Sequence, residues 1–256
     1  MMPCLKTSEA TARKNQLHGI IELLPKIESA NKLITAALSE CCNPVIAFSG
    51  GKDSLVVVNL VRKINKDVLC IFENTTNEYK ETLEFIKTVP NLVELHPEKT
   101  YRQCVTEYGL PENKAKGKRH GSACCFWLKE KPARDYYKKE NVDLVFTGLT
   151  ASESRNRMMM FKRMGAYYFY KKDKYFKCHP IWNWTEQEVW AYIDFNKLKY
   201  NKIYDVIGRI LNERYTRCGC KECTAFVSWK DIANKYDEQI TNRIMRTKGN
   251  KVLTDF

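Results

Sequence analysis

The chain has 256 residues, with 43 Lys and Arg against 30 Asp and Glu, and a formal net charge of +13. Because 44% of the residues are hydrophobic, the chain can bury a core, and wholesale disorder is excluded. No apolar run reaches the roughly 20 residues that a membrane-spanning helix needs, and the first residues lack the apolar core of a signal peptide. We therefore expect a soluble cytoplasmic protein with no membrane partner.

Charge and cysteine content narrow the class of partner and chemistry. The positive excess favours a polyanion such as nucleic acid, although a lysine-rich surface that serves only solubility would have the same composition. In a reducing cytosol, 11 cysteines indicate metal or sulfur chemistry before disulfides.

The predicted elements alternate between strands and helices after a helical start. Thr7–Glu40 is predicted to be helical, with Pro25 kinking or splitting the segment. Short apolar runs predict buried strands at Pro44–Phe48, Val68–Phe72, Leu92–Leu95 and Asp143–Thr147, with helices at Ser54–Lys63 and Glu81–Thr88. This alternation predicts an α/β fold with a doubly wound parallel sheet that helices cover on both faces.

The later part of the chain is predicted to be mainly helical. The capping pattern Thr185–Glu188 opens a helix to about Asn196, and the tail from Thr216 is rich in cysteine and then helical to about Arg246. Asn113–Arg119 is predicted to be a basic loop. The aromatic group Trp182, Trp184, Trp190 and Tyr192 is expected in the core rather than stacked on a base.

The segment Ser49-Gly-Gly-Lys-Asp-Ser54 is the most informative motif. It follows a predicted buried strand and opens a predicted helix, the setting in which backbone N–H groups and a helix N-terminus hold an anion. Gly50 and Gly51 allow close approach of phosphate oxygens, Ser49 and Ser54 add hydroxyl donors, Lys52 supplies a cation, and Asp53 can hold Mg²⁺. The spacing differs from that of the Walker loop.

This segment resembles the PP-loop of the ATP pyrophosphatase superfamily, also described as adenine nucleotide α-hydrolase-like. Three further segments resemble the phosphoadenosine phosphosulfate (PAPS) reductase-like branch, although Thr76 stands where the branch has glycine. They are Ile71–Thr82, Thr147–Arg155 and His179–Asp205, in the order of the branch. The resemblance implies that ATP is bound by residues 49–54 together with Gly148 and Arg155, with Lys52 and Asp53 catalytic.

Cysteines form a second constellation. Cys124 and Cys125 are adjacent, and Cys220 and Cys223 follow about ninety residues later. Four thiolates can hold zinc or a [4Fe–4S] cluster, and adjacent cysteines are awkward for zinc. The arrangement resembles that of the cluster-binding members of the branch, which implies these four cysteines as ligands of a [4Fe–4S] cluster. Cys218 is a spare thiol next to them.

The organisation that the resemblance implies has three parts: an N-terminal helical arm (1–42), a PP-loop nucleotide-binding domain (43–215) and a Cys-rich helical extension (216–256). Sulfonucleotide reductases of the branch use a cysteine in a C-terminal Glu-Cys-Gly segment, whereas no cysteine follows Cys223 in this sequence. We therefore expect an ATP pyrophosphatase that adenylates an acceptor and supports sulfur transfer to nucleic acid, as in DNA phosphorothioation or tRNA thiolation.

The expected cofactors are ATP, Mg²⁺ and the [4Fe–4S] cluster, and the expected partners are nucleic acid and a cysteine desulfurase as sulfur donor, with a homo-oligomer left open. Two alternatives stay open. The first is a reductase of adenylylsulfate (APS) or PAPS that takes its thiol from Cys218 or a partner. The second is a non-catalytic nucleotide- or nucleic-acid-binding module. Arg157 and His120 are further candidates for contacts with phosphates.

Overall fold

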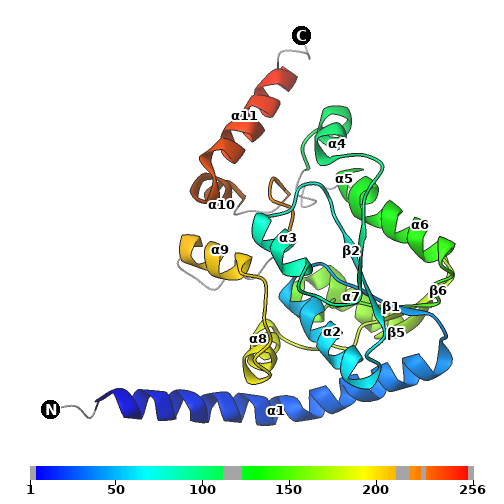
Figure 1. The fold of residues 1–256 in the computed structure, drawn as a ribbon, viewed down its shortest axis with the longest axis vertical. Coiled ribbons are helices and arrows are strands. Elements are labelled where there is room, and N and C mark those ends of the chain that lie inside the picture. Colours follow the sequence, from blue (N-terminus) through cyan, green and yellow to red (C-terminus); the bar gives the residue numbers. More distant parts are fainter. Residues whose placement is uncertain (1–3, 112–122, 212–218, 226–228, 253–256) are drawn as a thin grey trace. The chain divides into compact units, whose positions relative to one another are not determined.

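The computed structural model describes residues 4–111, 123–211, 219–225 and 229–252 (Figure 1). Asn113–Arg119, His120 and Cys218, which the sequence analysis singled out, lie outside this range. Within the described residues, no helix has the length and apolar character that crossing a membrane requires.

The strands form one six-stranded sheet in the order β3-β2-β1-β4-β6-β5. They are β1 (Pro44–Ala47), β2 (Leu69–Glu73), β3 (Leu92–Leu95), β4 (Leu144–Phe146), β5 (Tyr167–Tyr170) and β6 (Tyr175–Cys178). Strands β1 and β4 pair in parallel, as do β4 and β6. The first four strands confirm the sequence prediction and the α/β class.

The sheet is mostly parallel and departs from the predicted parallel arrangement at one edge. Strand β5 runs antiparallel to β6, with Phe169 opposite Phe176. The two strands are joined by a tight turn in which Lys174 has a φ of 59° and its N–H donates to the Tyr170 carbonyl over 2.9 Å. A turn this short can join only antiparallel strands.

The described chain divides into two compact units, each assembled from several segments. The first comprises Met1–Phe48, Lys52–Cys70 and Asn141–Tyr200, and the second comprises Ser49–Gly51, Ile71–Glu140 and Asn201–Phe256. The three-part division predicted from the sequence is not tested by these units and stays a prediction.

Helices α1 (Cys4–Glu40), α2 (Lys52–Ile64), α7 (Arg155–Met164) and α8 (Glu186–Phe195) belong to the first unit. Of the two predicted effects of Pro25, a kink or a split, the structure excludes the split, because helix α1 continues through Pro25. Buried Leu23, Ala30 and Ile34 hold it on both sides of the proline, and packing of this kind offsets the missing N–H. Trp184, Trp190 and Tyr192 are buried, which confirms the core interpretation for these three, whereas Trp182 is partly exposed.

The second unit contains seven helices among its described residues and one π-helical segment. The helices are α3 (Lys80–Ile86), α4 (Tyr101–Tyr108), α5 (Ala123–Cys125), α6 (Lys131–Lys139), α9 (Ile203–Leu211), α10 (Trp229–Tyr236) and α11 (Glu238–Val252). The π-helical segment Phe126–Glu130 joins α5 to α6. Helices α10 and α11 pack through buried Trp229, Ala233, Ile240 and Ile244.

Candidate functional site

The phosphate-loop motif lies where the sequence placed it, between buried strand β1 and helix α2. Gly50 has a φ of 71°, a conformation in which glycine is strongly favoured. Its carbonyl accepts a hydrogen bond from Asn201 Nδ2 at 3.2 Å, and the same amide nitrogen donates to Thr82 Oγ1 at 2.9 Å. A side chain at Gly50 would lie 3.1 Å from the Thr82 methyl. Thr82 and Asn201 therefore fix the shape of the loop.

Lys52 and Asp53 form an ion pair at the start of α2. Lys52 is 4% exposed, and its Nζ lies 2.9 Å from Asp53 Oδ2 and 4.0 Å from Glu186 Oε1. Burying an ammonium group is costly unless carboxylates compensate it, and here two are near. The pair places a cation and an anion beside the helix N-terminus, where a nucleotide phosphate and Mg²⁺ need them.

Gly148 lies against the same helix start, directly after strand β4. A Cβ atom at this position would be 2.7 Å from the Asp53 carbonyl carbon and 2.7 Å from the Ser54 nitrogen. Only glycine allows the two backbones to approach this closely. The structure thus brings Gly148 together with Asp53 and Ser54, as the predicted nucleotide site requires.

His179 supports the segment that contains Gly148. It is 1% exposed, and its Nδ1 lies 2.6 Å from Thr147 Oγ1. Burial lowers the pKa of His179 to about 3, with Lys177 and Arg157 adding to the shift. The ring is therefore neutral at pH 7 and fixes the Thr147 hydroxyl without adding charge.

The two arginines that were predicted to contact phosphates, Arg155 and Arg157, differ in their surroundings. Arg155 is exposed at the first position of α7, while Arg157 pairs with Glu153. Ser154 caps the helix by accepting from the Arg157 N–H at 3.2 Å. Arg155 is thus accessible at a helix N-terminus, and its role toward phosphate stays a prediction.

The four predicted ligand cysteines lie within the second unit, and three of them, Cys125, Cys220 and Cys223, influence one another electrostatically. Cys124 is buried, and Cys125, Cys220 and Cys223 are half-buried. Burial raises the pKa of Cys220 and of Cys223. Cys125 adds to both shifts, which indicates that the two distant cysteine pairs lie close together.

Two residues that the sequence analysis did not single out hold the Cys220–Cys223 turn. Asn77 accepts from the Lys221 N–H through its carbonyl at 2.7 Å and from the Glu222 N–H through its side chain at 3.2 Å. The buried Tyr101 hydroxyl donates to the Glu222 carbonyl at 2.7 Å. Asn77 falls inside the segment that resembles the family, whereas no sequence signal marks Tyr101.

Lys129 brings positive charge to the cysteines. It lies in the π-helical segment after Cys125, and the Cys220 thiol raises its pKa, with Glu78 and Glu73 adding to the shift. Burial raises the pKa of Glu73 to about 7, against the effect of Lys129. A cation beside several thiols favours their thiolate forms, which are the forms that ligate metal.

The donor set fits an iron–sulfur cluster in its chemistry. Four soft thiols with a cation beside them, in a partly desolvated region, are the ligands that such a cluster uses. In the described parts of the chain, no three His, Cys, Asp or Glu side chains are arranged to hold a single metal ion. As described, the four thiols therefore do not form a closed ligand cage.

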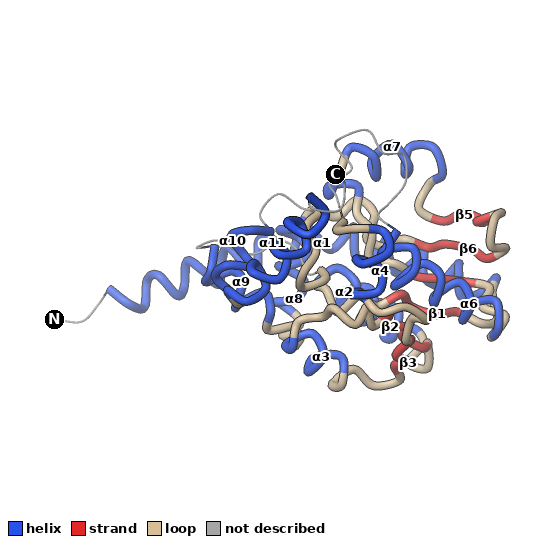
Figure 2. The backbone as a smooth tube through the Cα atoms, turned by 90° about the horizontal axis from the view of Figure 1, so that it is seen from above, coloured by secondary structure: helices blue, strands red, loops and turns tan. Residues whose placement is uncertain are grey.

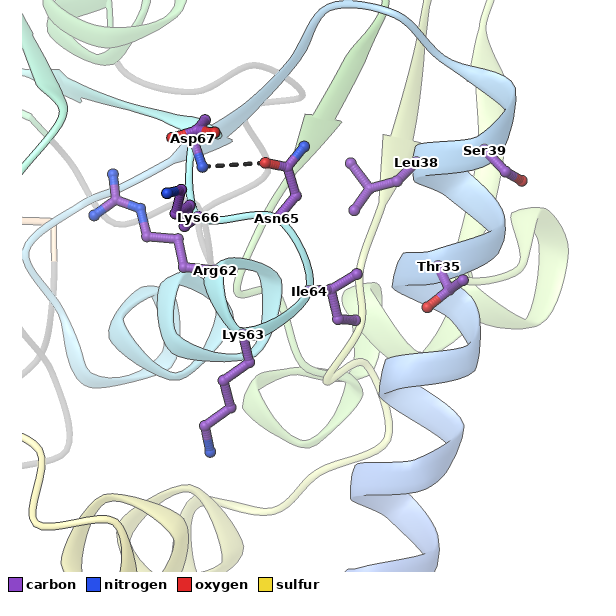
Figure 3. Close-up of a pocket in the computed structure, with 9 residues that line it drawn as sticks. All are labelled: Thr35, Leu38, Ser39, Arg62, Lys63, Ile64, Asn65, Lys66 and Asp67. Atoms are coloured by element: carbon purple, nitrogen blue, oxygen red, sulfur yellow. Dashed lines mark hydrogen bonds between the residues drawn. The ribbon is translucent and has the colours of Figure 1, made fainter.

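The structure also contains a pocket of about 760 Å³ that no sequence motif predicted (Figure 3). It lies between the last turns of α1 and the C-terminal end of α2, next to Leu38, Ile64 and Asn65. Figure 3 shows Lys63 pointing away from Leu38, and Lys63 Nζ donates to Asn196 Oδ1 at 2.9 Å. Because the phosphate loop lies at the other end of α2, this pocket is not the predicted nucleotide site.

The fold and the loop define an α/β protein with a glycine-rich loop between its first strand and the helix that follows. The sequence pattern of the phosphoadenosine phosphosulfate reductase domain matches residues 43–226, and the chain belongs to this family. It is 30% identical over 190 residues to an adenosine 5'-phosphosulfate reductase of Staphylococcus epidermidis, covering 71% of this chain and 70% of that protein. It is 33% identical over 189 residues to an uncharacterized protein of Methanocaldococcus jannaschii, covering 71% of this chain but 36% of that protein.

Solved structures with the same fold come from two kinds of enzyme. A PAPS reductase from Candida auris in a phosphate complex has a TM-score of 0.57 at 22% identity, covering 75% of this chain and 88% of that one. An FMN adenylyltransferase from Candida glabrata has a TM-score of 0.56 at 11% identity, covering 80% and 63%. At these identities the likeness concerns the fold alone.

Proposed function

We propose that the protein is an ATP pyrophosphatase that adenylates an acceptor and supports sulfur transfer to nucleic acid, as in DNA phosphorothioation or tRNA thiolation. One observation carries the proposal: a glycine-rich loop with an ion pair between buried Lys52 and Asp53, and a group of cysteines (Cys125, Cys220 and Cys223) near Lys129, occur in one chain. The first suits nucleotide phosphates, and the second suits sulfur chemistry. The positive net charge suits a polyanionic acceptor.

The adenylation step would proceed at the phosphate loop. An acceptor oxygen forms a bond to the α-phosphorus of ATP, the bond between that phosphorus and the bridging oxygen breaks, and pyrophosphate leaves. Lys52 and the backbone N–H groups of the loop would stabilise the charge that develops on the leaving pyrophosphate, and Asp53 would hold Mg²⁺. A nucleophilic sulfur then forms a bond to the activated atom and AMP leaves.

Cys124, Cys125, Cys220 and Cys223 would hold a [4Fe–4S] cluster, which in this class of reaction supplies a site for the sulfur. Lys129 would oppose the effect of burial, favour the thiolate forms that the cluster needs, and offset part of their negative charge. Asn77 and Tyr101 would keep the Cys220–Cys223 turn in place through the hydrogen bonds described above. The sulfur itself would come as the terminal sulfur of a persulfide from a cysteine desulfurase. Once that sulfur has bonded to the activated atom and AMP has left, a thiol reductant would cleave the remaining S–S bond and be oxidised to a disulfide.

A second candidate is a reductase of a sulfonucleotide such as APS or PAPS. The relatives that are named adenosine 5'-phosphosulfate reductase favour it. The same loop would bind the phosphates of the sulfonucleotide, and a thiol would attack its sulfur and release the nucleotide. The two candidates share the loop and the cysteines and differ in the bond that breaks.

One experiment separates them. The anaerobically purified protein is incubated with ATP, with APS and with PAPS, each in the presence of DNA or RNA as acceptor and of sulfide as sulfur source, and pyrophosphate, AMP and sulfite are measured. The proposal predicts pyrophosphate and AMP from ATP and no sulfite from APS or PAPS in the presence of a thiol reductant. Sulfite from either sulfonucleotide without pyrophosphate from ATP would establish the reductase. Lys52→Met should abolish either activity, and Lys87→Met, on an exposed position, serves as the matched control.

A further inference from the structure

More than half of the net charge of the chain is concentrated in one short segment. Residues 155–178 contain eight Lys and Arg and one Asp, a net charge of +7, against +13 for all 256 residues. The segment forms helix α7 and the β5–β6 hairpin, which all belong to the first unit. A concentration of one sign of charge on consecutive elements creates a field that attracts polyanions.

The two elements are held together as one surface. The ring of Phe161 on α7 lies 5.2 Å from the ring of His179, and Tyr168 on β5 lies 5.7 Å from the same ring. Figure 2 shows α7 beside the end of the sheet where β5 and β6 lie. Strand β5 ends the strand order, so the hairpin forms an edge of the sheet. We call α7 and the hairpin, residues 155–178, the basic edge.

Most of the charge on the basic edge faces solvent. The exposed basic residues are Arg155, Lys162, Arg163, Lys171, Lys172 and Lys174. The one acidic residue of the segment, Asp173, is half-buried. Of the remaining two cations, Arg157 pairs with Glu153, and Lys177 lies 3.8 Å from the centre of the Tyr170 ring.

Large apolar side chains are exposed among these charges. Phe169 is 44% exposed and Met159 is 58% exposed, and Met158 and Met164 are exposed as well. Phe169 makes an edge-to-face contact with Phe176, with ring centres 5.1 Å apart, and this contact holds its ring in place. The partly exposed ring lies just before the turn that carries Lys171, Lys172 and Lys174, so it offers a stacking face for a base next to cations for the adjoining phosphates.

We infer that the basic edge binds single-stranded nucleic acid. This inference rests on the proposed function, for which it identifies the surface that holds the acceptor. Bases in a duplex are already stacked and paired, so an exposed Phe169 ring gains contacts only from an unpaired base. An anionic membrane surface would also attract the charge, but membrane-bound helices separate a basic face from an apolar one, whereas Met158, Met159, Lys162 and Arg163 are exposed together on α7.

Fluorescence anisotropy with labelled 20-nucleotide single strands of DNA and of RNA tests the inference. The triple variant Lys171→Glu/Lys172→Glu/Lys174→Glu should weaken binding at least tenfold and reduce the log–log salt dependence by about 2, since each lost phosphate contact changes the slope by about 0.7. The matched control carries the same charge change at exposed positions elsewhere, Lys87→Glu/Lys138→Glu/Lys199→Glu, and should keep most of the affinity.

A second pair of variants tests the ring. Phe169→Leu should weaken binding about fivefold, because it removes the stacking face while keeping an apolar side chain, and Phe169→Trp should retain binding. Thermal unfolding followed by circular dichroism confirms that each variant is folded. Two results would overturn the inference. One is equal oligonucleotide affinity of the two charge variants, and the other is a protein that binds anionic phosphatidylserine vesicles but no oligonucleotide.

The same set of measurements keeps the inference apart from the proposed function. If the wild-type protein releases pyrophosphate from ATP and the basic-edge triple variant still binds oligonucleotides, the proposed function stands and the inference about the basic edge is rejected. If the triple variant loses oligonucleotide binding but the wild-type protein releases no pyrophosphate from ATP, the inference about the basic edge stands and the proposed function is rejected.

Discussion

Gly148→Ala is the substitution for which the structure gives the sharpest expectation. The new Cβ would lie 2.7 Å from two backbone atoms of Asp53 and Ser54, whereas ordinary contacts begin at 3.4 Å, so the backbones must separate by about 0.7 Å. Overpacking of this kind costs about 1–3 kcal/mol of the free energy of unfolding. For a chain of this size, each kcal/mol lowers the midpoint of thermal unfolding by about 2–4 °C.

The same displacement should impair nucleotide turnover. A hydrogen bond of about 2.9 Å from a loop N–H to phosphate would stretch to about 3.6 Å, beyond hydrogen-bonding distance. Pyrophosphate release and urea unfolding are measured on the same preparation. Gly109→Ala is the control, since Gly109 has a φ of 79° at the end of α4 and its replacement strains the backbone away from the loop. Unchanged stability and pyrophosphate release in Gly148→Ala would refute the reasoning.

Three other predictions concern single groups. Lys52→Met should lower pyrophosphate release at least a hundredfold, measured with saturating ATP, because it removes the cation at the loop. Because the pKa of His179 is about 3, the unfolded chain binds a proton below about pH 6.5 that the folded chain does not. The free energy of unfolding should therefore fall by up to about 1.4 kcal/mol per pH unit below pH 6.5, and His179→Asn should show a smaller fall in urea titrations at pH 7.5 and 5.5. Anaerobically prepared protein should contain iron and sulfide in near-equal amounts, and Cys124→Ser or Cys220→Ser should lose both, whereas Cys42→Ser, at an exposed thiol, should not. Stoichiometric zinc without sulfide would contradict this last prediction.

The central elements of the fold were predictable because their sequence signals are local. A buried parallel strand is a short apolar run, and a helix start such as Thr185 with Glu188 is a capping box, which the structure contains. Strands β5 and β6 were missed, since Tyr167–Tyr170 and Tyr175–Cys178 are rich in aromatic residues and lysine and lack that signature. Their pairing depends on contacts across the hairpin and with His179.

The candidate site was predictable where a motif carries the chemistry. The loop residues and the four cysteines could be named from the sequence, but the side chains that fix them could not. Asn201 reaches Gly50 across 151 positions of the chain, and Tyr101 reaches Glu222 across 121. Contacts at such separations follow from the fold, and no local pattern reports them. The motif alone likewise did not indicate that Lys52, the first residue of α2, is buried.

The π-helical segment Phe126–Glu130 makes the site sensitive to the number of residues between the Cys124–Cys125 pair and Lys129. A π-helical turn corresponds to one residue inserted into an α-helix, and a single deletion would restore regular α-helical winding. The residues beyond the segment would then keep their orientation, because the wider π-helical turn absorbs the extra residue, whereas residues inside the segment would shift relative to Cys124 and Cys125. Lys129, which lies inside the segment, would be displaced relative to the thiols, while Tyr137 on α6 would stay buried. Homologous chains that keep both the cysteine pair and this lysine should therefore tolerate substitutions between them far better than insertions or deletions.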